Sequence, residues 1–212
     1  MKRILLSLVL CLLMAMPVFA DDVERMNNAM QYVDTGTGLS NIREIGLIEF
    51  KHIGVDGEVL WHGVSFNSLL DDGEQMFLDC VLRSQNCPTT FYLRLADSTS
   101  TCSIIDTNTV AQIVAFGQPS TNGYAHQTIT RDSSGWPTLS LDSGDYQATS
   151  SVETFSASGG SWGPVHCAWL SNSNADSGTY PTAYAIAAVA LSQGRTLANG
   201  ESLQATLKIK LQ

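Results

Sequence analysis

From Ile42 onward, apolar and polar residues alternate in the short runs that are typical of β-strands. The stretch "EIGLIEFKHIGVDGEVLWHGVSF" holds two apolar runs joined by "VDGE", and Asp-Gly between two such runs indicates a β-hairpin. Three further stretches have a strand pattern: "TFYLRLAD", "YAHQTITR" and "PVHCAWLSNS". Short strands separated by Gly, Asn and Asp turns are typical of an antiparallel sandwich.

The C-terminal half continues this pattern. "WPTLSLDSGDYQATSSVETFSAS" predicts short strands around a "DSGD" turn, and "TAYAIAAVALSQ" predicts a strand of small residues. "GRTLANGESLQATLKIKLQ" predicts a hairpin arm with its turn at "ANGE". We therefore predict a mainly β fold for residues 43–212, an antiparallel, jelly-roll-like β-sandwich with one main helix packed on it.

The main helix is predicted in "NSLLDDGEQMFLDCVLRSQNCP", where apolar residues recur at helical spacing. Asp71 or Asp72 can cap its start, Glu74 falls in its first turn, and Pro88 prevents its continuation. The prediction is a helix over residues 72–83. A weaker pattern in "DTNTVAQIVAF" predicts a second, short helix.

The first twenty residues resemble a secretory signal. Lys2 and Arg3 precede an apolar run from Ile4 to Met16, and "VFA" provides small residues before a cleavage point. The run is short for a membrane span. We predict a signal peptide at 1–20 and an N-terminal arm or linker at 21–42; the alternative is an uncleaved anchor or an amphipathic oligomerisation segment.

The net charge of the chain limits the kinds of partner that we expect for it. The formal net charge is −9, and without Lys2 and Arg3 it is −11, with 9 basic residues against 20 acidic ones. Such a chain repels phosphate backbones, so we expect no nucleic-acid partner. It also lacks the polybasic patch that binds anionic lipid, so we expect no membrane contact after signal cleavage. The charge favours solubility.

Four cysteines follow the predicted cleavage point: Cys80, Cys87, Cys102 and Cys167. An even number in an exported chain predicts two disulfides, and four cysteines allow three pairings. Cys80 and Cys87 are close enough in sequence to close a small loop at the helix end, which leaves Cys102 with Cys167. A zinc site would need tighter C-x₂₋₄-C spacing, which is absent.

The stretch "GGSWG" has the G-x-S-x-G pattern of a serine-hydrolase nucleophile elbow, with Ser161 at its centre. An elbow needs a helix after the serine, whereas "PVHCAWL" alternates as a strand. No acidic residue lies between Ser161 and His166, and no histidine follows His166. Triads in other orders, with an upstream histidine, remain open: His52, His62 or His126. We interpret "GGSWG" as a glycine turn that leads into a strand burying Cys167 and Trp169.

Other candidates for chemistry have structural explanations. The carboxylates of "DDGE" and "DSGD" could serve a glycosidase or bind calcium, but helix capping and a turn explain them. The four tryptophans could line a carbohydrate face, although core and sheet packing is their commoner use: Trp61, Trp136, Trp162 and Trp169. The chain has no P-loop and no G-x-G-x-x-G motif. We predict no enzyme activity, cofactor or metal.

The order of segments resembles a class of bacteriophage structural proteins: tail, tail-fibre and baseplate-associated proteins. The resemblance covers about 155 residues, Gly57 to Leu211. It is carried by "GEVLWHGVSFNSLLDDGEQMFLDCVL", "FYLRLAD", "GYAHQTITRDSSGW", "TFSASGGSWGPVHCAWLSNS" and "AYAIAAVALSQGRTLANGESLQATLKIKL". Each motif is a strand or helix with its turn, and the order of the motifs is more specific than any one of them. The resemblance implies a non-enzymatic virion component with a β-sandwich fold, and it carries over no catalytic residue.

The signal and the cysteines conflict with this resemblance, because phage particles are normally assembled in the cytoplasm. Two functions therefore follow from the sequence. The first is a structural component of a phage particle, located in the virion, with other virion proteins or copies of itself as partners. The second is an exported binding protein, periplasmic or extracellular, that recognises a glycan or another cell-surface ligand.

Overall fold

A computed structural model describes residues 44–97, 102–142 and 144–211 of the chain. The predicted signal peptide at 1–20 and the arm at 21–42 lie outside the described residues. No helix in the described ranges is long and apolar enough to cross a membrane.

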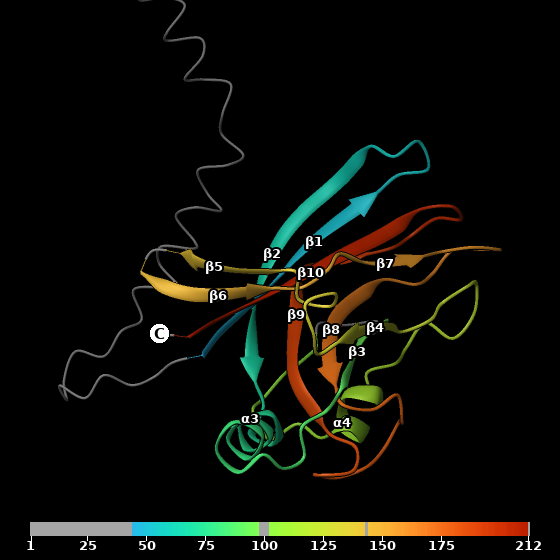
Figure 1. The fold of residues 1–212 in the computed structure, drawn as a ribbon. Coiled ribbons are helices and arrows are strands. Elements are labelled where there is room, and N and C mark those ends of the chain that lie inside the picture. The colour runs from blue at the N-terminus through green and yellow to red at the C-terminus, as the bar shows by residue number, and fades with distance from the viewer. Residues whose placement is uncertain (1–43, 98–101, 143, 212) are drawn as a thin grey trace, which may run out of the picture. The chain divides into compact units, whose positions relative to one another are not determined.

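The described part is an antiparallel β-sandwich, as the sequence predicts (Figure 1). The strand order is β4-β3-β8-β9-β2-β1-β10-β6-β5, and β7 also pairs with β10. Strand β2 belongs to both sheets, because it pairs with β1 along most of its length and with β9 at its end. The strands are β1 (Glu44–Ile53), β2 (Val59–Leu69), β3 (Thr90–Ala96), β4 (Gln127–Thr130), β5 (Thr138–Asp142), β6 (Asp145–Thr149), β7 (Glu153–Ser156), β8 (Val165–Ser171), β9 (Ala185–Arg195) and β10 (Ser202–Leu211).

The two hairpins predicted from Asp-Gly and "DSGD" are confirmed. Strands β1 and β2 pair in antiparallel register, and the Gly54 N–H donates to the Glu58 carbonyl at 2.8 Å to close the turn. Gly57 has φ +82°, a backbone conformation that favours glycine. Strands β5 and β6 pair from Thr138–Thr149 to Asp142–Asp145, with Gly144 at φ +99° in the turn.

The predicted C-terminal hairpin arm is wrong. Strand β10 follows a turn at residues 199–200 but pairs with β1, β6 and β7, whereas β9 pairs with β2 and β8. The reason lies in the side chains of the two strands. The apolar face of β10 meets that of β1, with Leu207 opposite Ile48, and β9 is a run of small residues buried between two neighbours.

The main helix, α3 (Asp71–Arg83), begins one residue before its predicted start. Leu70 is the N-cap and makes no side-chain capping bond, so the prediction that Asp71 or Asp72 caps the helix is wrong. Leu70 is fully buried, and its N–H donates to the Ile186 carbonyl at 2.9 Å. Packing against β9 therefore decides where the helix starts. The three acidic residues of the first turn are still favourable at the positive end of the helix dipole.

The short predicted helix is also present, as α4 (Val110–Val114), and both helices lie at the same end of the sandwich in Figure 1. Thr109 and Gln112 form a capping box at its start. Val110 and Ile113 are buried, so this single turn is held by packing. It contacts strand β8 through Trp169 in one apolar cluster.

The main core lies between the two sheets. It joins Ile48, Phe50, Leu203 and Leu207 from one sheet with Leu93, Leu95, Ala168, Leu170 and Val189 from the other. The alternation in "PVHCAWL" predicts that Val165, Cys167 and Trp169 share one face of β8. The prediction is wrong for Val165. The register with β9 shifts between Val165 and Cys167, which turns Val165 into the main core. Cys167 and Trp169 lie on the opposite face and are fully buried there, as predicted.

Candidate functional site: an apolar groove beside helix α3

Ser161 lies in an exposed loop that leads into a strand. Strand β8 begins four residues later, where a nucleophile elbow would have a helix. The Asn122 amide donates to the Ser161 carbonyl at 2.7 Å, and the Trp162 indole N–H donates to the Asn122 carbonyl at 3.0 Å. Gly159, at φ +81°, allows the turn. The glycines of "GGSWG" therefore form a loop that positions the buried Trp162 side chain.

The other histidine candidates are distributed over the sandwich. The His62 Nε2 atom lies 3.2 Å from Glu49 Oε1 on the sheet surface, and buried His52 lies 2.9 Å from Glu201. The His126 ring packs edge-on against Tyr92, and its pKa is lowered by burial and then by the charge of Arg94. In the described ranges, no group of three or more His, Cys, Asp or Glu side chains could hold a metal ion.

The carboxylates of "DDGE" and "DSGD" lie at a helix start and at a hairpin turn. Those of "DDGE" lie in the first turn of α3. Those of "DSGD" flank the β5–β6 turn, where the Lys210 ammonium lies 3.5 Å from Asp142 and 3.6 Å from Asp145. Lys210 is almost fully buried, so this cation joins the hairpin to β10.

The four cysteines form the two disulfides that the sequence predicts. Cys80 in α3 is bonded to Cys87, with their Cα atoms 4.8 Å apart. Cys102 is bonded to Cys167 in β8, with their Cα atoms 6.1 Å apart. The second bridge joins residues 65 positions apart in the chain. Two disulfides fit an oxidising environment.

The tryptophans serve packing. Trp162 and Trp169 are buried, and Trp61 and Trp136 pack against the main core while remaining partly exposed. Trp136 meets Phe91 edge to face, with ring centroids 6.2 Å apart. Trp136 also lines an open apolar groove of about 440 Å³.

The groove lies between helix α3 and the β5–β6 hairpin, which project on the same side of the sandwich in Figure 1. Met76, Phe77, Cys80 and Val81 from α3 form one wall. Leu139, Tyr146 and Ala148 from the hairpin form the other wall, together with Ile209 of β10. Leu170, Ile186 and Leu207 of the core form the floor. The groove is therefore the open side of the sandwich core.

Two glycines set the shape of this groove. Gly73 of α3 is buried against the Ile186 carbonyl of β9, where any Cβ atom would collide with that carbonyl. Its missing side chain lets the helix approach the strand backbone. Gly46 of β1 lies opposite Ile209, so the wall has no side chain at that position. The helix is thus close to the sheet at its N-terminus, and the groove runs beside its later turns.

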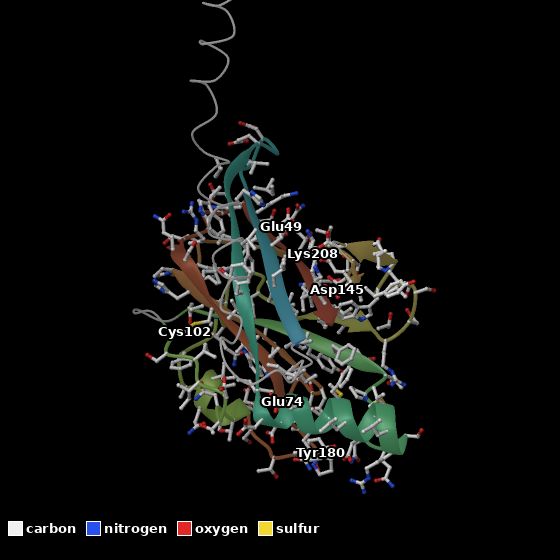
Figure 2. All side chains as sticks on the ribbon, turned by 90° about the vertical axis from the view of Figure 1, so that its left-hand side faces the viewer. Glu49, Glu74, Cys102, Asp145, Tyr180 and Lys208 are labelled. Atoms are coloured by element: carbon white, nitrogen blue, oxygen red, sulfur yellow. A yellow bond between two sulfur atoms is a disulfide. The ribbon has the colours of Figure 1, made fainter. Side chains whose placement is uncertain are left out.

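A hydrogen-bonded cluster holds the C-terminal half of α3. Asp79 is almost fully buried and accepts hydrogen bonds from the Tyr180 hydroxyl, from Asn86 at 2.9 Å and from Arg83 at 2.6 Å. The bonds from Tyr180 and Asn86, and then the charge of Arg83, lower the pKa of the Asp79 carboxyl. Figure 2 shows Tyr180 at the helix. This cluster therefore holds the C-terminal half of the α3 wall in place.

The groove continues into exposed apolar side chains. Leu139 is 72% exposed, Tyr146 64% and Val81 60%. Leu141, which pairs with Tyr146 on the same face of the hairpin, extends this surface. A contiguous exposed apolar patch on a soluble domain marks an interaction site or a ligand groove. We call the groove and these side chains the apolar face.

Two cationic residues contribute to the lining of the groove. The Arg131 guanidinium lines the groove and donates to the Cys80 sulfur at 2.9 Å, a weak acceptor. Lys208 also lines it and pairs with Glu49 at 3.1 Å, and Figure 2 shows Glu49, Lys208 and Asp145 in sequence across the sheet. Partial burial raises the pKa of Glu49, but the hydrogen bonds and charges of Lys208 and Lys51 lower it more. By strand alternation the Lys208 ammonium and Glu49 lie on the opposite face of the sheet, whereas the Arg131 guanidinium lies beside the groove.

The apolar face is not among the sites predicted from the sequence. A signal was present, because Leu139 and Leu141 alternate along β5, Tyr146 pairs with Leu141 on the same face, and α3 carries apolar residues on more than one side. An amphipathic pattern shows which side chains share a face, but it does not show whether the same chain covers that face.

In comparisons with protein-family models, with curated proteins and with solved structures, nothing matches this chain.

Proposed function

We propose that this protein is a non-enzymatic interaction component of an assembly outside the cytoplasm, and that the apolar face is its partner-binding surface. The observation that carries the proposal is the groove of about 440 Å³ with its rim of exposed Leu139, Tyr146 and Val81. A bare apolar surface of this kind is stabilised when a partner removes it from water. The groove brings together no nucleophile–base pair, which favours binding over catalysis.

The assembly that the segment order resembles is a phage particle, with this chain as a tail or virion-surface component. The two disulfides favour a second candidate, an exported binding protein for a cell-surface ligand, because disulfides persist in oxidising compartments. Both candidates use the same apolar face, and they differ in where the chain is found.

Fractionation of the source cells and of purified particles separates the two candidates. Mass spectrometry that finds the chain in intact particles at stoichiometric amounts supports the virion component. Recovery only in the soluble exported fraction supports the exported binding protein. Recovery as an unassembled cytoplasmic protein with reduced cysteines would contradict both.

Two matched valine variants test the apolar face. Val81 lines the groove and is 60% exposed, whereas Val55 in the β1–β2 turn lies outside the groove and is 67% exposed. We expect Val81→Glu to abolish association with the assembly, because it places a carboxylate in an apolar contact. Val55→Glu should leave association unchanged. Equal association of the two variants would contradict the proposed role of the groove.

A further inference from the structure

Strand β5 is one of the two edge strands of the sheet in the described structure, and β4 is the other. Strand β5 is the last strand of the order and pairs on one side with β6. A free edge presents backbone N–H and C=O groups that can pair with another strand, and proteins usually protect it with charges, proline or a cover. Within β5 the charged residue is Asp142, at its end, and the strand carries two exposed leucines, Leu139 and Leu141.

The β5–β6 hairpin determines which backbone groups point outward. A two-residue turn joins Asp142 to Asp145, so this first pair is a hydrogen-bonded pair, and hydrogen-bonded and non-hydrogen-bonded pairs then alternate. Thr138, Ser140 and Asp142 therefore direct their backbone groups towards β6. The backbone groups of Leu139 and Leu141 point to the free edge.

We propose that β5 pairs in antiparallel register with β5 of a second copy of this chain, about a two-fold axis at Ser140. The sequence Thr-Leu-Ser-Leu-Asp suits this arrangement. Leu139 lies opposite the partner's Leu141 in a hydrogen-bonded pair, and the reciprocal pair forms on the other side of the axis. Ser140 lies opposite the partner's Ser140 in a non-hydrogen-bonded pair.

Charge does not oppose a second copy at this particular edge, although the chain as a whole is acidic. The chain carries a net charge of −9, so contacts between most of its surfaces are repulsive. In the β5 pairing, Asp142 lies opposite the partner's Thr138, so no two carboxylates face each other. The Asp142 carboxylate also lies 3.5 Å from the Lys210 ammonium of its own chain.

The pairing connects the apolar faces of the two copies. Leu139 and Leu141 share the face of the hairpin that borders the groove, because Leu139 pairs with the groove residue Ala148 and Leu141 with Tyr146. A two-fold axis perpendicular to the sheet leaves both apolar faces on one side. The inference rests on the proposed function, since it names a second copy as one partner of the apolar face.

Cysteine cross-linking tests the register in the full chain. We expect Ser140→Cys, oxidised with glutathione disulfide, to form a disulfide-linked dimer on a non-reducing gel. The Cα atoms of a non-hydrogen-bonded pair are about 4.5 Å apart, within the range of a disulfide. Thr138→Cys is the matched control, because its side chain lies on the same face as Ser140 but is about 13 Å from its counterpart at ~3.3 Å per residue. It should form no disulfide-linked dimer on the same gel.

Sedimentation velocity of the wild type should show a monomer–dimer equilibrium that depends on concentration, because one short strand pair is smaller than a stable interface of about 1,200–2,000 Å². Absence of a Ser140→Cys dimer, or equal cross-linking of both variants, overturns the inference. If these fail while Val81→Glu still abolishes association, only the β5 pairing is wrong. If Val55→Glu and Val81→Glu associate equally, the proposed function is wrong.

Discussion

The two faces of the structure that lie beside the main core differ in what covers them. The outer face of β8 is covered by residues 102–118, which we call the cover segment and which include α4. The Cys102–Cys167 disulfide joins this segment to the strand. The apolar face has no cover from the described residues, and its leucines and valine remain exposed. The same kind of side chain is therefore core in one place and surface in the other.

Polar groups complete the covered face. The buried Arg94 guanidinium lies 4.4 Å from the centre of the Trp169 ring and donates to Gln118 at 2.7 Å, to the Ala175 carbonyl at 2.8 Å and to Asp176. A buried charge is tolerated when it is paired and hydrogen-bonded. The cationic group at the open groove, Arg131, has a sulfur acceptor instead. The covered face is therefore completed by the chain itself, whereas the apolar face stays open in the part of the chain that the structure describes.

The largest expected effect is that of removing Trp169. Trp169→Ala should lower the free energy of unfolding by about 3–5 kcal/mol, because it leaves a cavity under the cover segment. Trp136→Ala, at the half-buried groove wall, should cost less. Urea denaturation of both variants checks this contrast. Equal losses would mean that the covered and open faces contribute alike to stability.

Disulfide removal should show the same asymmetry. Replacing Cys102 and Cys167 by alanine opens a loop of 65 residues and should cost about 4 kcal/mol, whereas the separation of 7 for Cys80 and Cys87 predicts about 2 kcal/mol. Thermal and urea unfolding of the two double variants measure both values. A larger loss for the Cys80–Cys87 pair would place the main covalent support at the groove.

Acid should weaken the attachment of α3. The pKa of Asp79 is lowered in the folded state, so its contribution to stability is present above the unfolded value of about 3.9 and is lost as the pH falls through the folded pKa. Asp79→Asn should be less stable at neutral pH and should lose less on acidification. Urea unfolding between neutral and acidic pH measures this, with Asp56→Asn in the β1–β2 turn as control. An unchanged acid response in Asp79→Asn would contradict the role of the cluster.

Changes at the apolar face should affect stability little. Leu139→Glu should alter the free energy of unfolding by no more than about 0.5 kcal/mol, because the side chain is already 72% exposed. The same variant should reduce self-association at high concentration, which light scattering measures. A loss of several kcal/mol would show that Leu139 is covered in the full chain.

The smallest effect is expected at Ser161. Ser161→Ala should leave both thermal stability and function unchanged, because the loop is held by Gly159, the Ser161 carbonyl and the buried Trp162. Thermal melts and an esterase assay of the wild type and the variant check this. Turnover that requires the Ser161 hydroxyl would contradict the non-enzymatic proposal.

Local sequence patterns were sufficient to predict most of the helices and strands. The Asp-Gly turn, the strand alternation and the spacing of Met76, Phe77 and Cys80 predict the β1–β2 hairpin and α3, because turn geometry and side-chain periodicity are properties of neighbouring residues. The cysteine pairing also followed from short-range spacing, since Cys80–Cys87 closes a small loop and leaves a single remaining pair.

Contacts between residues far apart in the sequence determined the features that these local patterns did not predict. The partners of β10, the N-cap of α3 at Leu70 and the register shift at Val165 depend on which distant strand is adjacent. Many apolar surfaces of the chain could occupy that place. The apolar face is the clearest case. Trp169 and Leu139 both stand at apolar strand positions, but the chain covers Trp169 with the cover segment and leaves Leu139 at the edge of the sheet. The sequence by itself therefore determined the strands, most turns, the main helix and the disulfides. Only the tertiary structure decided which apolar surface remained open, because the burial of a residue depends on its neighbours in three dimensions.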